Sequence, residues 1–336
     1  MNELEYKAVR STVGLLDLSA RGRIEVSGRN SVQFLQGLVS NDVKLLTDGE
    51  GTYAAFLNAT GRIQADCFIY RDGERFLIDV PTIRRSWVYD NLTKFSPAGG
   101  FDVSDVTDQT VLLSLQGPQS TSLLRSLGIE EPVGYLKAKW GKIGGVATFV
   151  TCVSRTGEQG YDLFASVTEK SQLLKVLTDA GATPVAQETA EVLRIEAGIP
   201  AYGQDMDDSI ILLEAGLDHA VSYKKGCYLG QETIAKIHHR GQGQTAKRLA
   251  GLLIDSTQIP EIRSKIYNDA GNEIGYVTSS CYSPILGRAI ALAYLRRNNF
   301  SIGMRHTIAS GGGEHRLAAE VVALPFVGTY SQGKTR

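Results

Sequence analysis

Residues 52–80 read TYAAFLNATGRIQADCFIYRDGERFLIDV, the clearest β pattern in the chain. Runs rich in β-branched and aromatic residues occur at 52–57, 63–70 and 75–80. The connections between them, Asn58-Ala59-Thr60-Gly61 and Arg71-Asp72-Gly73, carry the Asn, Asp and Gly residues that tight turns favour. The stretch therefore predicts three antiparallel strands joined by two hairpin turns.

Helical patterns flank these strands. Upstream, residues 23–26 alternate like a strand, and Asn30 or Ser31 can cap a short helix after it. Downstream, residues 82–94 suit an amphipathic helix that ends before Pro97. A similar order of strand, helix and strands recurs from residue 111 onward, so the sequence predicts an α+β fold with a structural duplication rather than regular βαβ winding.

The pattern changes after Lys247. Short β-like runs then alternate with turn residues, at 249–254, 265–267, 274–278, 289–294 and 317–323. Such spacing is typical of a small β-barrel or sandwich. We therefore predict two α+β subdomains, roughly 1–108 and 109–245, followed by a small C-terminal β domain over 246–336, a barrel or a sandwich.

Charge and cysteine content exclude several classes of protein. The 336 residues carry 35 Lys and Arg against 36 Asp and Glu, which leaves no excess positive charge for a surface that holds bulk nucleic acid. The four cysteines form no CxxC element, so a local metal site is not expected, and they suit a reducing compartment. The N-terminus lacks a signal-peptide pattern, and no apolar run approaches the roughly 20 residues that span a bilayer. The sequence predicts a soluble, cytoplasmic protein without a membrane partner.

Charge is segregated in the middle of the chain. Residues 196–218 contain six acids and no Lys or Arg, whereas residues 224–248 contain six bases and a single acid, Glu232. Two solvated faces that pair with each other explain this pattern most simply. A basic cleft for a polyanionic small molecule or a partner is the alternative.

The basic block contains an unusual motif. It consists of Lys225, Gly226, Cys227, Tyr228, Leu229, Gly230, Gln231 and Glu232. Two glycines bracket the Cys-Tyr pair, so the backbone can turn tightly and present the thiol. Cys227 is either a small packing residue, as most cysteines are, or a reactive group with positive charge beside it.

Two acids stand among apolar neighbours. Asp66 lies in the predicted strand over 63–70, where a carboxylate has to be paired, hydrogen-bonded or next to a cavity. It either pairs with an arginine such as Arg62 or faces a ligand and handles a proton. Glu196 follows Arg194 near a helix end, where it either forms a local pair with that arginine or accepts hydrogen bonds from a ligand.

The chain resembles the folate-binding YgfZ family, which is itself similar to the glycine-cleavage T-protein, an aminomethyltransferase. Similar motifs follow one another in the same order, at residues 14–28, 115–118, 155–161, 194–198, 202–205 and 275–284. The segment 225–232 resembles the signature K-G-C-[FY]-x-G-Q-E of YgfZ proteins, which true T-proteins lack. This motif favours the YgfZ family over the T-proteins.

The resemblance implies a fold and a function. The fold is aminomethyltransferase-like and folate-binding, with two ferredoxin-like α+β domains and a C-terminal β-barrel arranged in a ring. The bound cofactor is tetrahydrofolate. The function is support of iron–sulfur cluster assembly or repair, with an indirect effect on tRNA modification. Iron–sulfur proteins or assembly factors are the implied partners, and no direct contact with nucleic acid is expected.

The same resemblance assigns roles to single residues. Asp66 matches an aspartate that assists attack by a folate nitrogen, and it either keeps that chemistry or orients the ring. Glu196 matches a glutamate that binds the pterin, and Lys225 matches a basic residue near the folate. Tyr161 belongs to the same set of cofactor-binding residues. The role of Cys227 rests on the YgfZ motif alone. The thiol is a nucleophile, a transient cluster ligand or a redox thiol.

Two other functions stay open at this point. A folate-dependent aminomethyl or methyl transferase needs Asp66 and tolerates the loss of Cys227. A non-catalytic scaffold retains the folate cavity without turnover. The sequence alone leaves open whether the chain is an enzyme.

Overall fold

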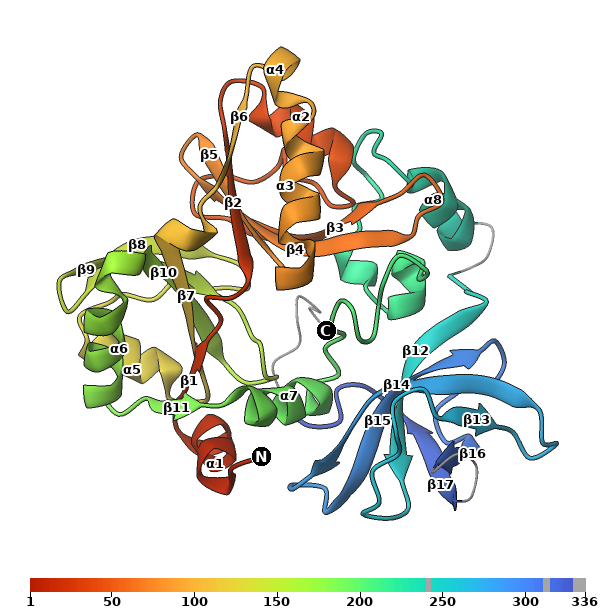
Figure 1. Ribbon diagram of the computed structural model, residues 1–336. Coiled ribbons are helices and arrows are strands. Elements are labelled where there is room, and N and C mark those ends of the chain that lie inside the picture. The colour runs from red at the N-terminus through yellow and green to blue at the C-terminus, as the bar shows by residue number, and fades with distance from the viewer. Residues whose placement is uncertain (240–242, 311–314, 329–336) are drawn as a thin grey trace.

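The computed structural model describes residues 1–239, 243–310 and 315–328. Two α+β units and a β-barrel surround helix α7 (Gln187–Glu196) and the long irregular segment that follows it (Figure 1). The α+β class and the C-terminal barrel confirm the prediction from sequence. Among the described residues, no helix is both long enough and apolar enough to cross a bilayer.

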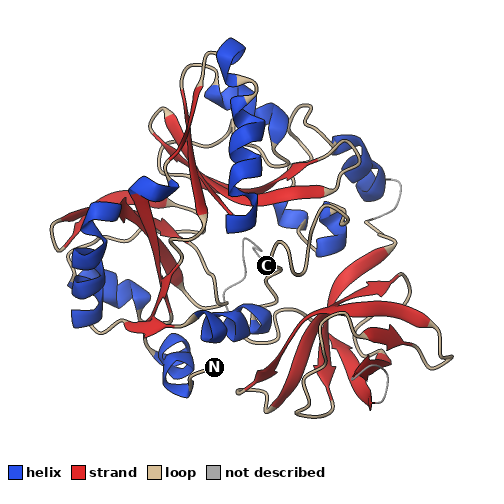
Figure 2. Cartoon of the chain, in the orientation of Figure 1, coloured by secondary structure: helices blue, strands red, loops and turns tan. Residues whose placement is uncertain are grey.

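The first unit is built on an antiparallel sheet with helices on one face (Figure 2). Its strands in spatial order are β3 (Gly51–Leu57), β4 (Ile63–Asp72), β5 (Arg75–Val80), β2 (Gly22–Ser27) and β6 (Asp102–Asp105). The three strands predicted from residues 52–80 are β3, β4 and β5, and both hairpins are present. The helices of this unit are α2 (Ser31–Leu38), α3 (Arg85–Thr93) and α4 (Ser96–Gly99).

Both faces of β4 are buried, but against different neighbours. Ala65, Cys67 and Ile69 pack with residues of α2 and α3, whereas Phe68 and Tyr70 belong to a core cluster shared with the other two bodies. Successive side chains of a strand point to opposite faces. Asp66 therefore lies on the face that is directed toward the centre of the molecule.

The second unit takes its first strand from the N-terminal segment. Its sheet has the order β11 (Thr183–Val185), β1 (Gly14–Asp17), β7 (Thr110–Gln116), β10 (Gly160–Ser166), β9 (Val146–Cys152) and β8 (Ala138–Ile143). Strand β1 runs parallel to β11 and antiparallel to β7. Helices of this unit are α1 (Glu3–Ser11), α5 (Ser120–Ser126) and α6 (Lys170–Asp179). The chain thus starts in the second sheet and crosses into the first between β1 and β2.

The third body is a closed barrel. Its strands in spatial order are β12 (Lys247–Ile254), β15 (Arg288–Arg296), β14 (Glu273–Ser283), β13 (Lys265–Tyr267), β16 (Arg305–Ser310) and β17 (His315–Val322). Alternate residues fill the barrel or face outward, and Ile290 and Leu292 on the outer face join the shared core. Helix α8 (Gln231–His239) precedes the barrel. The shared core holds the three bodies around α7.

Candidate functional site

A cavity of about 340 Å³ lies where the two sheets meet α7. Titratable side chains on its wall are Arg21, Tyr53, Asp66, Arg155, Glu191, Arg194 and Tyr202. A second cavity, of about 390 Å³, lies between the end of α7 and the barrel. The two share Ile199, Pro200 and Leu217 on their walls. Both are in the size range of small-molecule sites, and the first carries most of the titratable groups.

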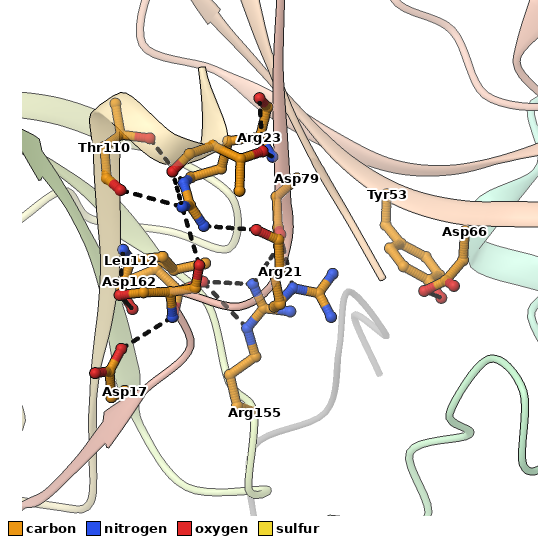
Figure 3. Close-up of polar contacts among 12 residues, drawn as sticks. Asp17, Arg21, Arg23, Tyr53, Asp66, Asp79, Thr110, Leu112, Arg155 and Asp162 are labelled. Atoms are coloured by element: carbon orange, nitrogen blue, oxygen red, sulfur yellow. Dashed lines mark hydrogen bonds and ion pairs between the residues drawn. The ribbon is translucent and has the colours of Figure 1, made fainter. Parts of the chain in front are cut away.

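Asp66 is buried on the wall of the first cavity. The pairing of β3 with β4 sets Ala55 opposite Asp66 and Tyr53 opposite Phe68, so Tyr53 and Asp66 share a face. The Tyr53 hydroxyl donates to Asp66 Oδ2 over 2.9 Å (Figure 3). Asp66 Oδ1 is buried without a hydrogen-bond partner among the described residues. The pairing with Arg62, one of the two alternatives for Asp66, is not formed, and Arg62 instead donates to the Ser209 carbonyl.

The ionisation of Asp66 is set by opposing effects. Burial raises the pKa of Asp66, while the positive charge of Arg21 and the hydrogen bond from Tyr53 act in the opposite direction. The nearby Asp79 carboxylate raises this pKa further. Asp66 is thus a buried carboxyl group with one free acceptor atom, which is the arrangement expected of a group that handles a proton.

Two arginines of the cavity wall are held by buried carboxylates. Arg21 Nε donates to Asp79 Oδ1 over 2.6 Å, and Arg155 Nη2 donates to Asp79 Oδ2 over 2.7 Å (Figure 3). Arg155 also binds Asp162 and stacks over the Phe68 ring at 4.3 Å. Burial alone would raise the pKa of Asp79, but the charges of Arg21 and Arg155 outweigh it and lower this pKa. The arginines are therefore fixed in place before any ligand binds.

Glu196 lies outside both cavities. Its carboxylate is fully buried and accepts hydrogen bonds from the Tyr6 hydroxyl, the Arg10 guanidinium and the Ser283 hydroxyl. These donors come from α1 and from β14, so Glu196 joins the N-terminal helix, α7 and the barrel. The local pair with Arg194 is absent, because Arg194 binds Glu191 and Asp205.

Tyr161 and Lys225 also lie away from the cavities. The Tyr161 side chain is packed in the core beneath α5, and its hydroxyl pairs with Thr121 Oγ1 at 2.8 Å. Lys225 Nζ donates to the backbone carbonyls of Val39 and Asn41. Burial lowers the pKa of Lys225 to about 8.

The remaining residues of segment 225–232 form a loop and the start of α8. Cys227 is an exposed free thiol. Tyr228 is buried in the shared core, and its backbone N–H donates to the Gln231 side chain. Gly230 has a positive φ of 84°, and a Cβ there would meet the Asn58 carbonyl oxygen at 2.5 Å. Glu232 is exposed and pairs with Lys236 along the helix.

Comparison with known protein families covers both parts of the chain. The GCVT N-terminal domain matches residues 1–225, and the glycine cleavage T-protein C-terminal barrel domain matches residues 247–328. The chain belongs to the glycine cleavage T-protein family. Its T-protein relatives include the aminomethyltransferases of Streptomyces avermitilis and Bacillus subtilis, to which it is 33% and 32% identical. Both matches cover 96% of this chain, and they cover 88% and 90% of the two relatives.

A solved structure of the same family has the same fold. The crystal structure of glycine cleavage system aminomethyltransferase T from Bartonella henselae superposes with a TM-score of 0.88 at 25% sequence identity. The match covers 96% of this chain and 89% of that one. The arrangement of two α+β units and a barrel is therefore the T-protein arrangement.

These findings correct the assignment to the YgfZ family and the iron–sulfur function that came with it. Similarity to T-proteins extends over 96% of the chain, whereas the preference for the YgfZ family over the T-proteins depended on the motif at 225–232. In the structure, Lys225, Tyr228 and Gly230 each have a local packing role that accounts for a basic, an aromatic and a glycine residue there. The findings give no support to a function in iron–sulfur cluster assembly or in tRNA modification.

The cofactor prediction is confirmed, since the T-protein family uses tetrahydrofolate. The first cavity fits a ligand of this chemistry. Asp66 Oδ1 and Arg21 Nη2 are a buried acceptor and a buried donor without partners among the described residues. Leu16, Phe68 and Leu217 on the same wall offer apolar surface to an aromatic ring system.

Sequence reasoning missed Arg21, Tyr53, Asp79 and Arg155. Arg21 and Arg155 lie in loops, and Tyr53 and Asp79 lie in strands that the hairpin pattern had already explained. The signal that was present is Asp79 itself, because an acid in the middle of the apolar run 76–80 requires a buried partner.

Proposed function

We propose that this chain is an aminomethyltransferase that transfers a one-carbon unit to tetrahydrofolate, with Asp66 as the group that handles the proton. The single observation that carries the proposal is the free, buried Oδ1 atom of Asp66 on the cavity wall. The names and the extended similarity of the T-protein relatives support it.

The roles of the cavity residues follow from their contacts. Tetrahydrofolate, when bound, supplies the nitrogen that accepts the one-carbon unit. When this nitrogen bonds to the carbon, the bond between the carbon and its donor would break, and the donor would leave with the electron pair. The nitrogen would give up a proton, and we assign its acceptance to Asp66 Oδ1. Tyr53 holds Oδ2 and so keeps the carboxyl group oriented.

The other residues singled out from the sequence have supporting roles in this proposal. We assign Glu196 and Lys225 to holding the segments that surround the cavity, and Tyr161 to the core of the second unit. Cys227 has no part in the transfer, since its thiol is exposed and outside the lining of both cavities.

The decisive experiment measures tetrahydrofolate binding by calorimetry and one-carbon transfer from candidate aminomethyl donors. We expect Asp66→Asn to lower kcat by about 100-fold or more, because the amide cannot accept the proton. Cys227→Ala is the matched control and should keep the wild-type rate. Full activity of Asp66→Asn, or a folded wild-type protein that does not bind tetrahydrofolate, would overturn the proposal.

A further inference from the structure

Arg21 stands between two acidic groups. Figure 3 shows its side chain between the Asp79–Arg155–Asp162 cluster and the Tyr53–Asp66 pair. Its Nε atom is bound to Asp79, whereas its Nη2 atom is buried without a hydrogen-bond partner among the described residues. The unpartnered atoms of Arg21 and Asp66, one a donor and one an acceptor, thus belong to residues on the wall of a single cavity.

Arg21 is held by its backbone as well as by its side chain. Its N–H donates to the Leu18 carbonyl over 2.9 Å, and its own carbonyl accepts from the buried Arg23 side chain over 2.7 Å. Together with the Asp79 ion pair, these contacts fix a positive charge at the cavity wall. A charge that is already in place acts on a neighbouring carboxyl group without reorganisation.

We propose that Arg21 is a positioning residue for Asp66: anchored on Asp79, it keeps the Asp66 carboxyl group ionised and ready to accept a proton from the bound ligand. The inference rests on the proposed function, because it takes Asp66 as the proton acceptor. It adds a residue to the site whose effect on the proton transfer is exerted through Asp66.

Other charged and polar groups face the same carboxyl group. Tyr53 on β3 donates to it, and Asp79 on β5 opposes its ionisation. Arg155 lies on the same wall, but its donors are directed to Asp79 and Asp162. Tyr202 also lies on the cavity wall. Burial raises its pKa most, the Arg84 charge lowers it, and the charges of Asp208, Asp207 and Asp66 raise it further. Of these groups, Arg21 is the cation that most strongly favours the ionised form of Asp66.

The test is the pH dependence of one-carbon transfer to tetrahydrofolate. Asp66 has to be ionised to accept a proton, so the rate falls on the acidic side as Asp66 becomes protonated. Removing the Arg21 charge in Arg21→Met favours the protonated form of Asp66. The acidic limb of the pH–rate profile, where the rate falls, should therefore move to higher pH. We expect the ratio of the rate at about pH 6 to that at about pH 8 to fall by roughly threefold or more.

Three further variants separate charge from structure. Arg21→Gln keeps an N–H donor for Asp79 but lacks the charge, so it should shift the limb as Arg21→Met does. Arg21→Lys should restore the wild-type profile. Arg84→Met is the matched control: it removes an arginine that stacks on Tyr202, 5.4 Å from that ring, and should leave the limb in place.

The outcomes distinguish the inference from the proposed function. Equal loss of rate at every pH in Arg21→Gln, with an unshifted limb, would show that Arg21 only supports the structure and would overturn the inference. Wild-type activity of Asp66→Asn would instead overturn the proposed function. A shifted limb in both neutral variants, restored by lysine, is the expected result.

Discussion

Glu196 illustrates how one side chain can join three parts of the fold. Tyr6 and Arg10 of α1 and Ser283 of β14 all donate to its carboxylate, and Arg10 also binds Glu158 over 2.7 Å. Removing one member of a buried ion pair leaves the other charge without compensation. The role that the contacts support for Glu196 is therefore to hold α1 and the barrel against α7.

We expect Glu196→Gln to lower the free energy of unfolding by about 3 kcal/mol, because the buried Arg10 charge loses a carboxylate partner. Urea unfolding measures this change. Glu188→Gln is the control, since Glu188 is exposed and its one ion pair within the described part of the chain is with the N-terminus at 3.4 Å. Native stability of Glu196→Gln together with weakened tetrahydrofolate binding would favour the ligand contact that the family resemblance implied.

The loop over 222–230 is an element positioned by its neighbours more than by its own hydrogen bonds. Lys225 reaches the carbonyls of Val39 and Asn41, and Tyr228 inserts into the shared core. Gly230 packs against the β3–β4 turn, where its positive φ and the nearby Asn58 carbonyl exclude a side chain. The loop thereby supports the hairpin that carries Asp66.

Gly230→Ala should destabilise the protein by about 1–3 kcal/mol, because alanine is strained at this φ and its Cβ meets a backbone oxygen. Gly226→Ala is a control in the same loop, since a Cβ at Gly226 meets no atom within 4 Å. Its effect should stay within about 0.5 kcal/mol. Thermal and urea unfolding of both variants check this order, and a reversed order would contradict the packing role of Gly230.

At the scale of the whole molecule, Asp205 connects the central segment to the barrel. Its buried carboxylate accepts from Arg194 of α7 over 2.7 Å, from Thr278 Oγ1 over 2.5 Å and from Ser279 Oγ over 2.6 Å. Arg194 itself lies on the wall of the first cavity. The position of the barrel and the position of a cavity residue therefore depend on the same polar cluster.

Asp205→Asn should lower the free energy of unfolding by about 3 kcal/mol, because it removes the charge that pairs with buried Arg194. Hydrogen exchange in β14 should become faster, since the barrel loses a contact with α7. Asp255→Asn, at an exposed carboxylate bound to Arg305, is the control and should change little. Unchanged exchange in β14 would show that Asp205 does not couple the barrel to α7.

Local patterns were sufficient for the elements with strong periodicity. The runs within 52–80 became β3, β4 and β5, and the pattern over 82–94 became a 3₁₀ turn followed by α3, which ends at Thr93. Short elements escaped notice, because β6 and β11 have few apolar residues and depend on pairing with partners distant in sequence. Strand β1 also depends on partners distant in sequence, since it pairs with β7 and β11.

Charge patterning along the chain did not predict where charge gathers in space. The alternative interpretation of the bases of 224–248 was a basic cleft, yet the arginines of the first cavity are Arg21, Arg155 and Arg194. The two charged blocks meet directly at Asp218 and Arg248, 3.4 Å apart. Charges pair through space, so a block in the sequence does not show which groups will be its neighbours.

The sequence by itself determined the α+β class, a small C-terminal β domain and the need of an acid at position 66 for a partner or a cavity, because alternation, turn residues and an acid in an apolar run are local signals. Only the tertiary structure decided that Asp66 accepts a hydrogen bond from Tyr53 and shares a cavity wall with Arg21, while Glu196 and Lys225 bind other segments of the chain. The physical reason is that the protonation and accessibility of a carboxyl group depend on burial and on charges from other strands and loops. Those neighbours are brought together only when the two sheets and α7 close around the cavity.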